Sequence, residues 1–134
     1  MSYAGDVNSQ DAYKTLCDDP VAVMVDVRTQ AEWTYVGSPD IQRVLYISWL
    51  SYPDCVVNSD FVAQVEASGV NKAHPVYLLC RSGARSAAAA TALTAAGYTQ
   101  AYNIADGFEG DLHTNGQRGH INGWKASRLP WRQS

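Results

Sequence analysis

The stretch LLCRSGARSAAAA, residues 78–90, places a cysteine between an apolar run and an alanine-rich block. The apolar run is typical of a buried strand, and the alanine block has high helix propensity. Between them, Ser82, Gly83 and Ala84 are small enough for a sharp turn, and glycine adopts positive φ at little steric cost. The stretch therefore predicts a strand, a tight turn and a helix, with Cys80 at the carboxyl end of the strand.

Strands and helices are predicted to alternate along the rest of the chain. The predicted strands are residues 21–27, 43–49, 75–80 and 101–107, with a short edge strand at Val7. Four helices are predicted. The first is capped by Asn8 or Ser9 and ends near residues 18–20, and the second begins with a Thr29–Glu32 capping box. The third is capped by Asn58 or Ser59 and ends at Gly69, and the fourth covers residues 84–96 and stops at Gly97. Residues 36–40, VGSPD, predict a turn. This alternation predicts an α/β domain with a mostly parallel central sheet and helices on both faces.

Length and composition point to one globular domain. The 134 residues suit a single domain, with 46% hydrophobic and 17% charged residues. We expect a core over residues 5–112. Residues 113–134 are expected to form a C-terminal loop rich in Gly, Asn and His, followed by a tail that packs on the core through Trp, Leu and Pro.

Several classes of function are not expected from the composition. The net charge of −3 argues against nucleic-acid binding, and no apolar run approaches the ~20 residues of a membrane span. The start of the chain does not resemble a secretory signal, so we expect a cytoplasmic protein. Cys17, Cys55 and Cys80 form no C-x-x-C pair and no metal-ligand spacing, so neither a disulfide framework, a metal site nor a cofactor is expected.

Cys80 is the candidate nucleophile. In open parallel sheets, ligands bind beyond the carboxyl ends of the strands, where this cysteine is predicted to lie. The following turn and helix start would offer amide groups and a positive dipole end, and Arg81 and Arg85 add two cations. Such surroundings make a thiol reactive. The alternative is that Cys80 is a buried small hydrophobe, which is the interpretation we favour for Cys17, on an apolar helix face, and for Cys55, in a loop.

Three segments resemble one known family. CRSGARS (residues 80–86) resembles the active-site loop of the rhodanese-like domain family of single-domain sulfurtransferases. VDVRTQAEW (25–33) resembles the Asp-Val-Arg segment of that family, and NIADGFEG (103–110) resembles its glycine-containing loop. The family usually carries a Gly-His-Ile-Pro-Gly-Ala segment between the second and third strands, where this chain has VGSPDIQRVLYIS (36–48). One wall of the cleft therefore differs from the family pattern.

The resemblance implies a sulfur-transfer reaction without cofactor or metal. The thiolate of Cys80 would take the outer sulfur of a donor such as thiosulfate and hold it as a persulfide. A thiol, cyanide or an acceptor protein would then remove that sulfur. The substrate-binding residues implied by the loop are Arg81, Ser82, Gly83, Ala84, Arg85 and Ser86.

The arginines and one carboxylate pair leave alternatives open. Arg81 is expected to bind an anionic donor. Arg85 would either do the same or hold the loop to a carboxylate such as Asp26 or Glu32. Asp26 and Arg28 are expected to support the site as an ion pair or a helix-cap network rather than to act on substrate.

Three rival functions follow from the same residues. A phosphatase or arsenate reductase would use a cysteine loop with five residues between Cys and Arg, whereas four separate Cys80 from Arg85. A silent regulatory or interaction module would be expected to have lost the cysteine. A sulfur relay to a specific partner would use the same chemistry for another purpose.

Overall fold

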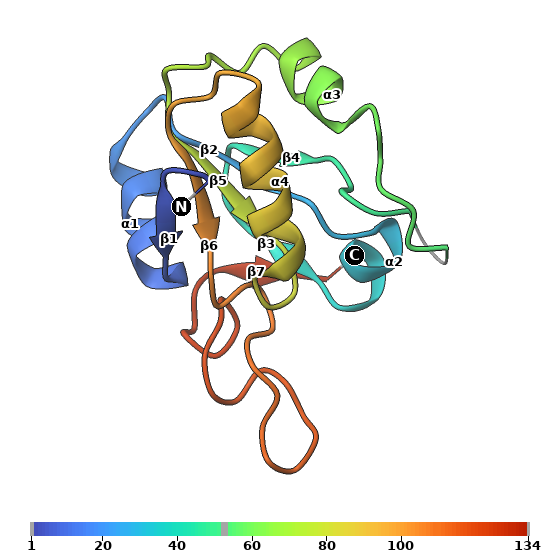
Figure 1. The fold of residues 1–134 in the computed structure, drawn as a ribbon. Helices are drawn as coiled ribbons and strands as arrows, with labels where there is room; N and C mark the ends of the chain where they lie inside the picture. Colours follow the sequence, from blue (N-terminus) through green and yellow to red (C-terminus); the bar gives the residue numbers. More distant parts are fainter. Residues whose placement is uncertain (1, 52–53, 134) are drawn as a thin grey trace.

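A computed structural model describes residues 2–51 and 54–133, and its centre is a five-stranded parallel sheet (Figure 1). The strand order is β1-β6-β5-β2-β4, and each neighbouring pair runs parallel. The strands are β1 (Gly5–Val7), β2 (Val23–Asp26), β4 (Val44–Tyr46), β5 (Val76–Leu79) and β6 (Ala101–Ile104). The predicted α/β fold with a parallel sheet is confirmed.

Some strands are shorter than the apolar runs that predicted them. The run over residues 43–49 contributes only β4, because the chain beyond Tyr46 makes scattered backbone bonds instead of a regular ladder. The amide of Ile47 donates to the Asp26 carbonyl, and the amide of Trp49 donates to the Val27 carbonyl. Apolar residues at the sheet edge are therefore buried without remaining in a strand.

Four helices connect the strands, namely α1 (Ser9–Asp18), α2 (Gln30–Tyr35), α3 (Phe61–Ala67) and α4 (Ala84–Ala95). Asn8 caps α1, and Thr29 with Glu32 forms the predicted capping box of α2. The predicted cap of α3 is wrong: Asp60 precedes that helix without a side-chain cap, and Asn58 accepts from the Asp60 amide in a turn instead. Within the described ranges, no helix has the length and apolar character needed to cross a membrane.

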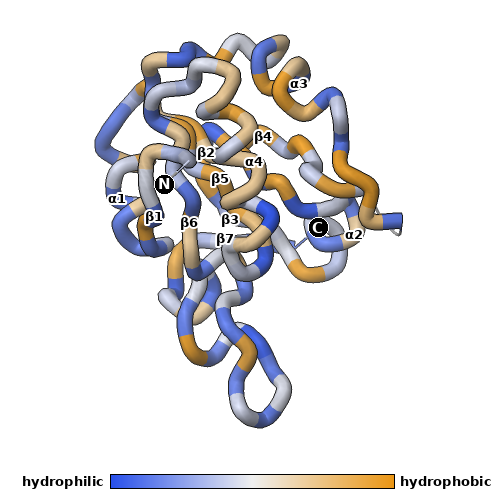
Figure 2. Tube along the Cα trace, in the orientation of Figure 1, coloured by the Kyte–Doolittle hydropathy of each residue, from blue (hydrophilic) through white to orange (hydrophobic). Residues whose placement is uncertain are grey.

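The two faces of the sheet are covered by different elements. On one face, Val25 of β2 and Leu78 of β5 belong to a buried cluster with Phe61 of α3 and Leu93 of α4. On the other face the alternate strand residues Met24 and Leu79, together with Tyr77, belong to a cluster with Ala12 and Leu16 of α1, and with Phe108 and Trp124. The alternation of side chains along a strand thus builds two cores, and Figure 2 shows hydrophobic residues gathered along the central strands.

The C-terminal tail returns to the sheet domain and forms a second, small sheet. Strand β7 (Trp131–Arg132) pairs antiparallel with β3 (Ser38–Pro39), in the segment predicted as a turn. Gly37 has φ +112°, and a Cβ there would lie 2.7 Å from the Trp131 ring, so glycine permits this close approach. Between β6 and β7, the loop around residues 111–122 projects from the domain (Figure 1) and is mostly hydrophilic (Figure 2).

Candidate functional site

Cys80 follows β5 directly and lies beneath the surface, with 1% of its area exposed. The Gly83 amide donates to the Cys80 sulfur at 3.1 Å. Gly83 is also the N-cap of α4 and has φ +106°, and a Cβ on it would overlap the Ala105 carbonyl. The tight turn between β5 and α4 therefore depends on glycine, and it directs a backbone N–H toward the thiol.

A chain of hydrogen bonds leads from the buried Cys80 sulfur to the surface. The Ser86 hydroxyl lies 3.1 Å from that sulfur and donates to the side-chain oxygen Oδ1 of Asn103 at 2.5 Å. The side-chain nitrogen Nδ2 of Asn103 donates to Oδ1 of Asp6 at 3.0 Å, and the Tyr3 hydroxyl donates to the same Asp6 oxygen at 2.8 Å. Since the Ser86 hydroxyl has one proton, and that proton points to Asn103, its oxygen is the acceptor of the Cys80 S–H.

The loop after β6 is hydrogen-bonded to the Cys80 loop through backbone groups. The Phe108 amide donates to the Cys80 carbonyl at 2.8 Å, and the amides of Glu109 and Gly110 both donate to the Arg81 carbonyl, at 3.0 and 3.1 Å. Gly107 begins this contact with φ +66°, where a Cβ would overlap the Arg81 carbonyl. The segment NIADGFEG thus holds the Cys80 loop through its backbone.

Arg85 forms an ion pair with Glu32, which is one of the two partners, Asp26 and Glu32, that the sequence allowed for it. Its two terminal nitrogens lie 2.7 and 2.9 Å from the two Glu32 oxygens, and both side chains are about four-fifths buried, with 20% and 19% exposed. Burial alone would raise the pKa of Glu32, but the hydrogen bonds and charge of Arg85 outweigh it and lower this pKa below its ordinary value. Helix α2 is therefore tied to the start of α4 next to Cys80.

A cleft of about 570 Å³ lies over this loop. Its walls are Thr29, Ala31, Glu32, Tyr35, Val36, Leu50, Ser51, Cys55, Arg81, Arg85 and Glu109. Helix α2 contributes to this lining together with Leu50, Ser51 and Cys55, and Val36 is the described residue of the segment 36–48 that takes part in it. The Arg81 side chain is exposed, and within residues 2–51 and 54–133 it makes no hydrogen bond or ion pair. Cys80 itself lies below the lining of the cleft.

Of the other predicted site residues, Ser82 belongs to the turn and is half-buried, and Ala84 is the exposed first residue of α4. Asp26 and Arg28 form a fully buried ion pair with contacts of 2.8 and 2.9 Å. Arg28 also donates to the Gly37 carbonyl at 2.8 Å. This pair joins the end of β2 to the turn before β3, so its position is that of a structural support.

The remaining cysteines and histidines are separate from Cys80. Cys17 and Cys55 are both exposed, so the expectation that each is a buried small hydrophobe is wrong, and Cys55 lines the cleft. His113 and His120 lie against each other in the projecting loop, with ring centroids 5.9 Å apart. Within the described residues, no group of three or more His, Cys, Asp or Glu is arranged to hold a metal ion.

Sequence reasoning missed two features of the site. Asn103 contacts Ser86 from 17 residues away along the chain, and Asp6 contacts Asn103 from 97 residues away. Cys55 lines the cleft, and its amide donates to the Ser51 carbonyl. A polar residue inside the otherwise apolar run AYNI was the one available signal for Asn103.

Solved structures that are similar to this chain share its fold. Rv0390 from M. tuberculosis superposes with a TM-score of 0.90 at 46% identity, over 98% of this chain and 99% of that one. The polysulfide-sulfur transferase homodimer from Wolinella succinogenes gives a TM-score of 0.70 at 24% identity, over 96% and 78%. The second likeness, at this identity, concerns the fold alone.

Sequence relatives include proteins with and without an assigned activity. An uncharacterized protein of Rickettsia conorii is 39% identical over 127 residues, which are 92% of this chain and 93% of the relative. Thiosulfate sulfurtransferase 18 of Arabidopsis thaliana is 38% identical over 86 residues, 63% of this chain and 62% of that protein. A family model described as the STR4 middle domain matches residues 4–134. The chain therefore belongs to the STR4 middle domain family, and it is similar to rhodanese-like proteins in fold and, more distantly, in sequence.

Proposed function

We propose that this protein is a sulfurtransferase that carries sulfane sulfur on Cys80. The observation that carries this function is the contact between the Gly83 amide and the Cys80 sulfur, at the start of a 12-residue helix. Amide donors and a helix N-terminus stabilise negative charge on sulfur, both in a thiolate and in a persulfide. The similarity of the chain to a thiosulfate sulfurtransferase and to a polysulfide-sulfur transferase supports the same chemistry.

The reaction has two half-steps. The Cys80 thiolate attacks the outer sulfur of thiosulfate, an S–S bond forms, and the S–S bond of the donor breaks with its electron pair leaving on sulfite. The product is a Cys80 persulfide anion. An acceptor nucleophile, cyanide or a thiolate, then attacks the terminal sulfur, and the Cys80 thiolate leaves with its electron pair. Sulfite is a stable anion, so neither half-step needs a general acid.

The residues around Cys80 have distinct roles in this scheme. Arg81 is exposed at the cleft, and its guanidinium binds the sulfonate end of the donor. Arg85 is held by Glu32 through both terminal nitrogens and acts by fixing the loop. Because Cys80 is 1% exposed, the donor reaches its sulfur only when side chains over the loop move aside.

Intact-protein mass spectrometry tests this function. After incubation with thiosulfate, the protein should gain one sulfur, about 32 Da, and peptide mapping should place it on Cys80. Added cyanide should remove the sulfur and form thiocyanate. Cys80→Ser should show no adduct, whereas Cys55→Ser should show it at the wild-type level. An adduct on Cys17 or Cys55 would contradict the assignment.

Two alternative functions, a phosphatase and a sulfur relay, can be tested by further assays on the same protein. Hydrolysis of p-nitrophenyl phosphate that depends on Cys80, without a sulfur adduct, would favour a phosphatase. Transfer of labelled sulfur to a protein acceptor but not to cyanide would favour a relay. We place the reaction in the cytoplasm, since the three free thiols suit a reducing compartment, and cell fractionation tests that location.

A further inference from the structure

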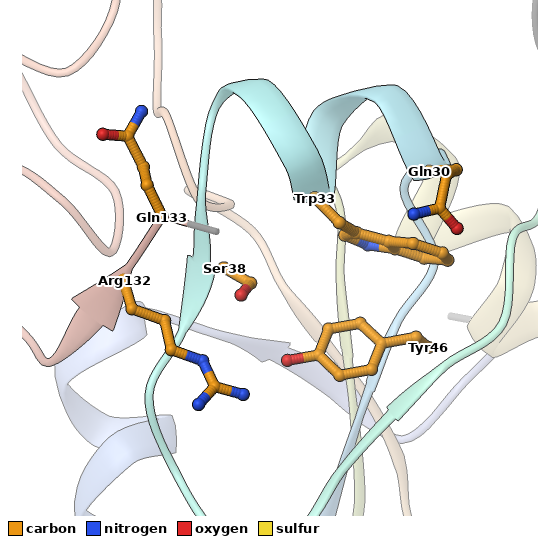
Figure 3. Close-up of a pocket in the computed structure, with 6 residues that line it drawn as sticks. All are labelled: Gln30, Trp33, Ser38, Tyr46, Arg132 and Gln133. Atoms are coloured by element: carbon orange, nitrogen blue, oxygen red, sulfur yellow. The ribbon is translucent and has the colours of Figure 1, made fainter.

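A second cavity, of about 630 Å³, lies away from the Cys80 cleft and shares none of its lining residues. It is bounded by α2, β3, the end of β4 and β7 (Figure 3). Its lining residues are Gln30, Trp33, Ser38, Tyr46, Arg132 and Gln133. This volume is within the range of sites that hold small organic molecules.

One side of the cavity is aromatic. Trp33 of α2 and Tyr46 of β4 make an edge-to-face pair, with ring centroids 5.2 Å apart and an interplanar angle of 70°. In Figure 3 the two rings lie one above the other along the same side of the cavity. Such a wall favours a flat, unsaturated body, which can stack on one ring and meet the edge of the other.

The other side of the cavity carries hydrogen-bond donors and one positive charge. Ser38 is 8% exposed, and among the residues that the structure describes its hydroxyl has no hydrogen-bond partner. Arg132 is exposed, and no described carboxylate lies within ion-pair distance of it. Figure 3 shows the Ser38 hydroxyl, the Arg132 guanidinium and the Tyr46 hydroxyl directed toward the same part of the cavity. None of the described residues that line the cavity is an Asp or a Glu.

The polar side is preformed by the small sheet. Ser38 and Arg132 are directly opposite each other in the β3–β7 pair, so their side chains share one face of that sheet. The neighbouring Trp131 is anchored by an edge-to-face contact with Phe108, at 6.1 Å, and by Lys125, whose ammonium lies 4.1 Å from its ring centroid. The tail therefore presents Arg132 from a fixed backbone.

We infer that this cavity binds a small organic oxyacid with a planar, unsaturated body. The oxyanion accepts hydrogen bonds from Arg132, Ser38 and Tyr46, and the planar body lies against Trp33 and the Tyr46 ring. A guanidinium and two hydroxyls satisfy an oxyanion without a competing carboxylate in the lining. The site is independent of the sulfur chemistry at Cys80.

A titration with benzoate, followed by ¹H–¹⁵N correlation spectra of the full chain, tests this site. Saturable shifts should appear at the amides of Ser38 and Arg132 and at the Trp33 indole. Benzamide, which has the same body without the charge, should bind roughly tenfold more weakly, the usual worth of one charge-assisted contact. Arg132→Gln should remove that difference and leave benzamide binding unchanged.

Matched variants keep the outcome interpretable. Arg128→Gln, an exposed arginine of the same tail outside the cavity lining, should leave benzoate binding unchanged. Tyr46→Phe and Ser38→Ala remove one hydroxyl each and should each weaken benzoate severalfold, with the rest of the spectrum showing an intact fold. The inference is overturned by no saturable shift up to about 10 mM, by shifts confined to the Cys80 cleft, or by equal binding of benzoate to Arg132→Gln.

Discussion

Cys80 and Cys55 lie near the same cleft in opposite surroundings. Cys80 is 1% exposed and its sulfur contacts the Gly83 amide and the Ser86 hydroxyl. Cys55 is exposed and lines the cleft, with φ +55° in a surface loop. The exposed thiol of Cys55 therefore lacks the amide donor that the buried thiol of Cys80 has. Because a thiol is nucleophilic where its surroundings stabilise the thiolate, we propose that the chemistry takes place at Cys80.

Substitution of each cysteine gives the largest expected effect. Cys80→Ser should reduce thiosulfate:cyanide sulfurtransferase turnover more than about 1000-fold, because a serine hydroxyl is far less acidic than a thiol. Cys55→Ser and Cys17→Ser should stay within about twofold of wild type. Sulfate should also slow alkylation of Cys80 by iodoacetamide but not of Cys55. Loss of turnover in Cys55→Ser with retention in Cys80→Ser would reverse the comparison.

The turn that supplies the amide donor to Cys80 is tested by two glycines that differ in their surroundings. Gly83 and Gly69 both have positive φ, +106° and +82°, but a Cβ on Gly69 would meet nothing within 4 Å, whereas one on Gly83 would overlap the Ala105 carbonyl. Gly69→Ala should cost about 1 kcal/mol of unfolding free energy through backbone strain alone. Gly83→Ala should cost about 3 kcal/mol, since the backbone must also move.

Urea unfolding measures both glycine effects, and turnover separates them further. Gly69→Ala should retain wild-type activity, because Gly69 follows the end of α3 and is not among the residues that line the cleft over Cys80. Gly83→Ala should lose activity even where the protein remains folded, since its amide no longer faces the sulfur. Equal stability and activity in the two variants would mean that the turn adapts to a side chain.

The parts of this structure that depend on local patterns could be predicted from sequence. Short apolar runs gave the parallel strands, and the spacing of Thr29 and Glu32 gave the cap of α2. The β3–β7 pair could not be predicted, because strands of two residues have no periodicity and this one joins segments about 90 residues apart along the chain.

Within the candidate site the same division holds. The nucleophile, the glycine turn and the following helix are contiguous, so CRSGARS predicted them together. The carboxylate that holds Arg85 is 53 residues away, and charge alone did not distinguish Glu32 from Asp26. Both carboxylate oxygens of Asp26 instead accept hydrogen bonds from the guanidinium of Arg28, two residues later in the chain. Long-range pairing between charged side chains is decided by packing, which a single sequence does not display.

The ion pair that holds the Cys80 loop gives a smaller expected effect. Glu32→Gln keeps a side chain suited to the capping box but removes the charge opposite Arg85. We expect a loss of about 1–2 kcal/mol in unfolding free energy at pH 7, because the pair is four-fifths buried. Glu66→Gln, which removes the exposed pair with Lys72, should cost no more than about 0.5 kcal/mol.

The stability difference between wild type and Glu32→Gln should depend on pH in a direction that follows from the lowered pKa of Glu32. Arg85 lowers the pKa of Glu32 in the folded protein, so the stabilisation is fully present above the ordinary value near 4.5 and is lost as pH falls through the lowered value. The difference in stability between wild type and Glu32→Gln should therefore shrink only below about pH 4.5. A difference that declines already between pH 7 and 5 would contradict this pairing.

Substitution of Arg81 is expected to give the smallest effect, and it tests whether the cleft over Cys80 favours negatively charged donors over uncharged ones. Its guanidinium is exposed and unpaired among the described residues, so Arg81→Ala should leave stability unchanged. It should lower kcat/KM for thiosulfate about tenfold and for an uncharged organic trisulfide less than about twofold, since one charge-assisted contact is lost. Arg128→Ala, another exposed arginine outside the cleft lining, controls for the change in net charge. Equal losses with both donors would mean that Arg81 shapes the loop around Cys80 and does not contact the donor.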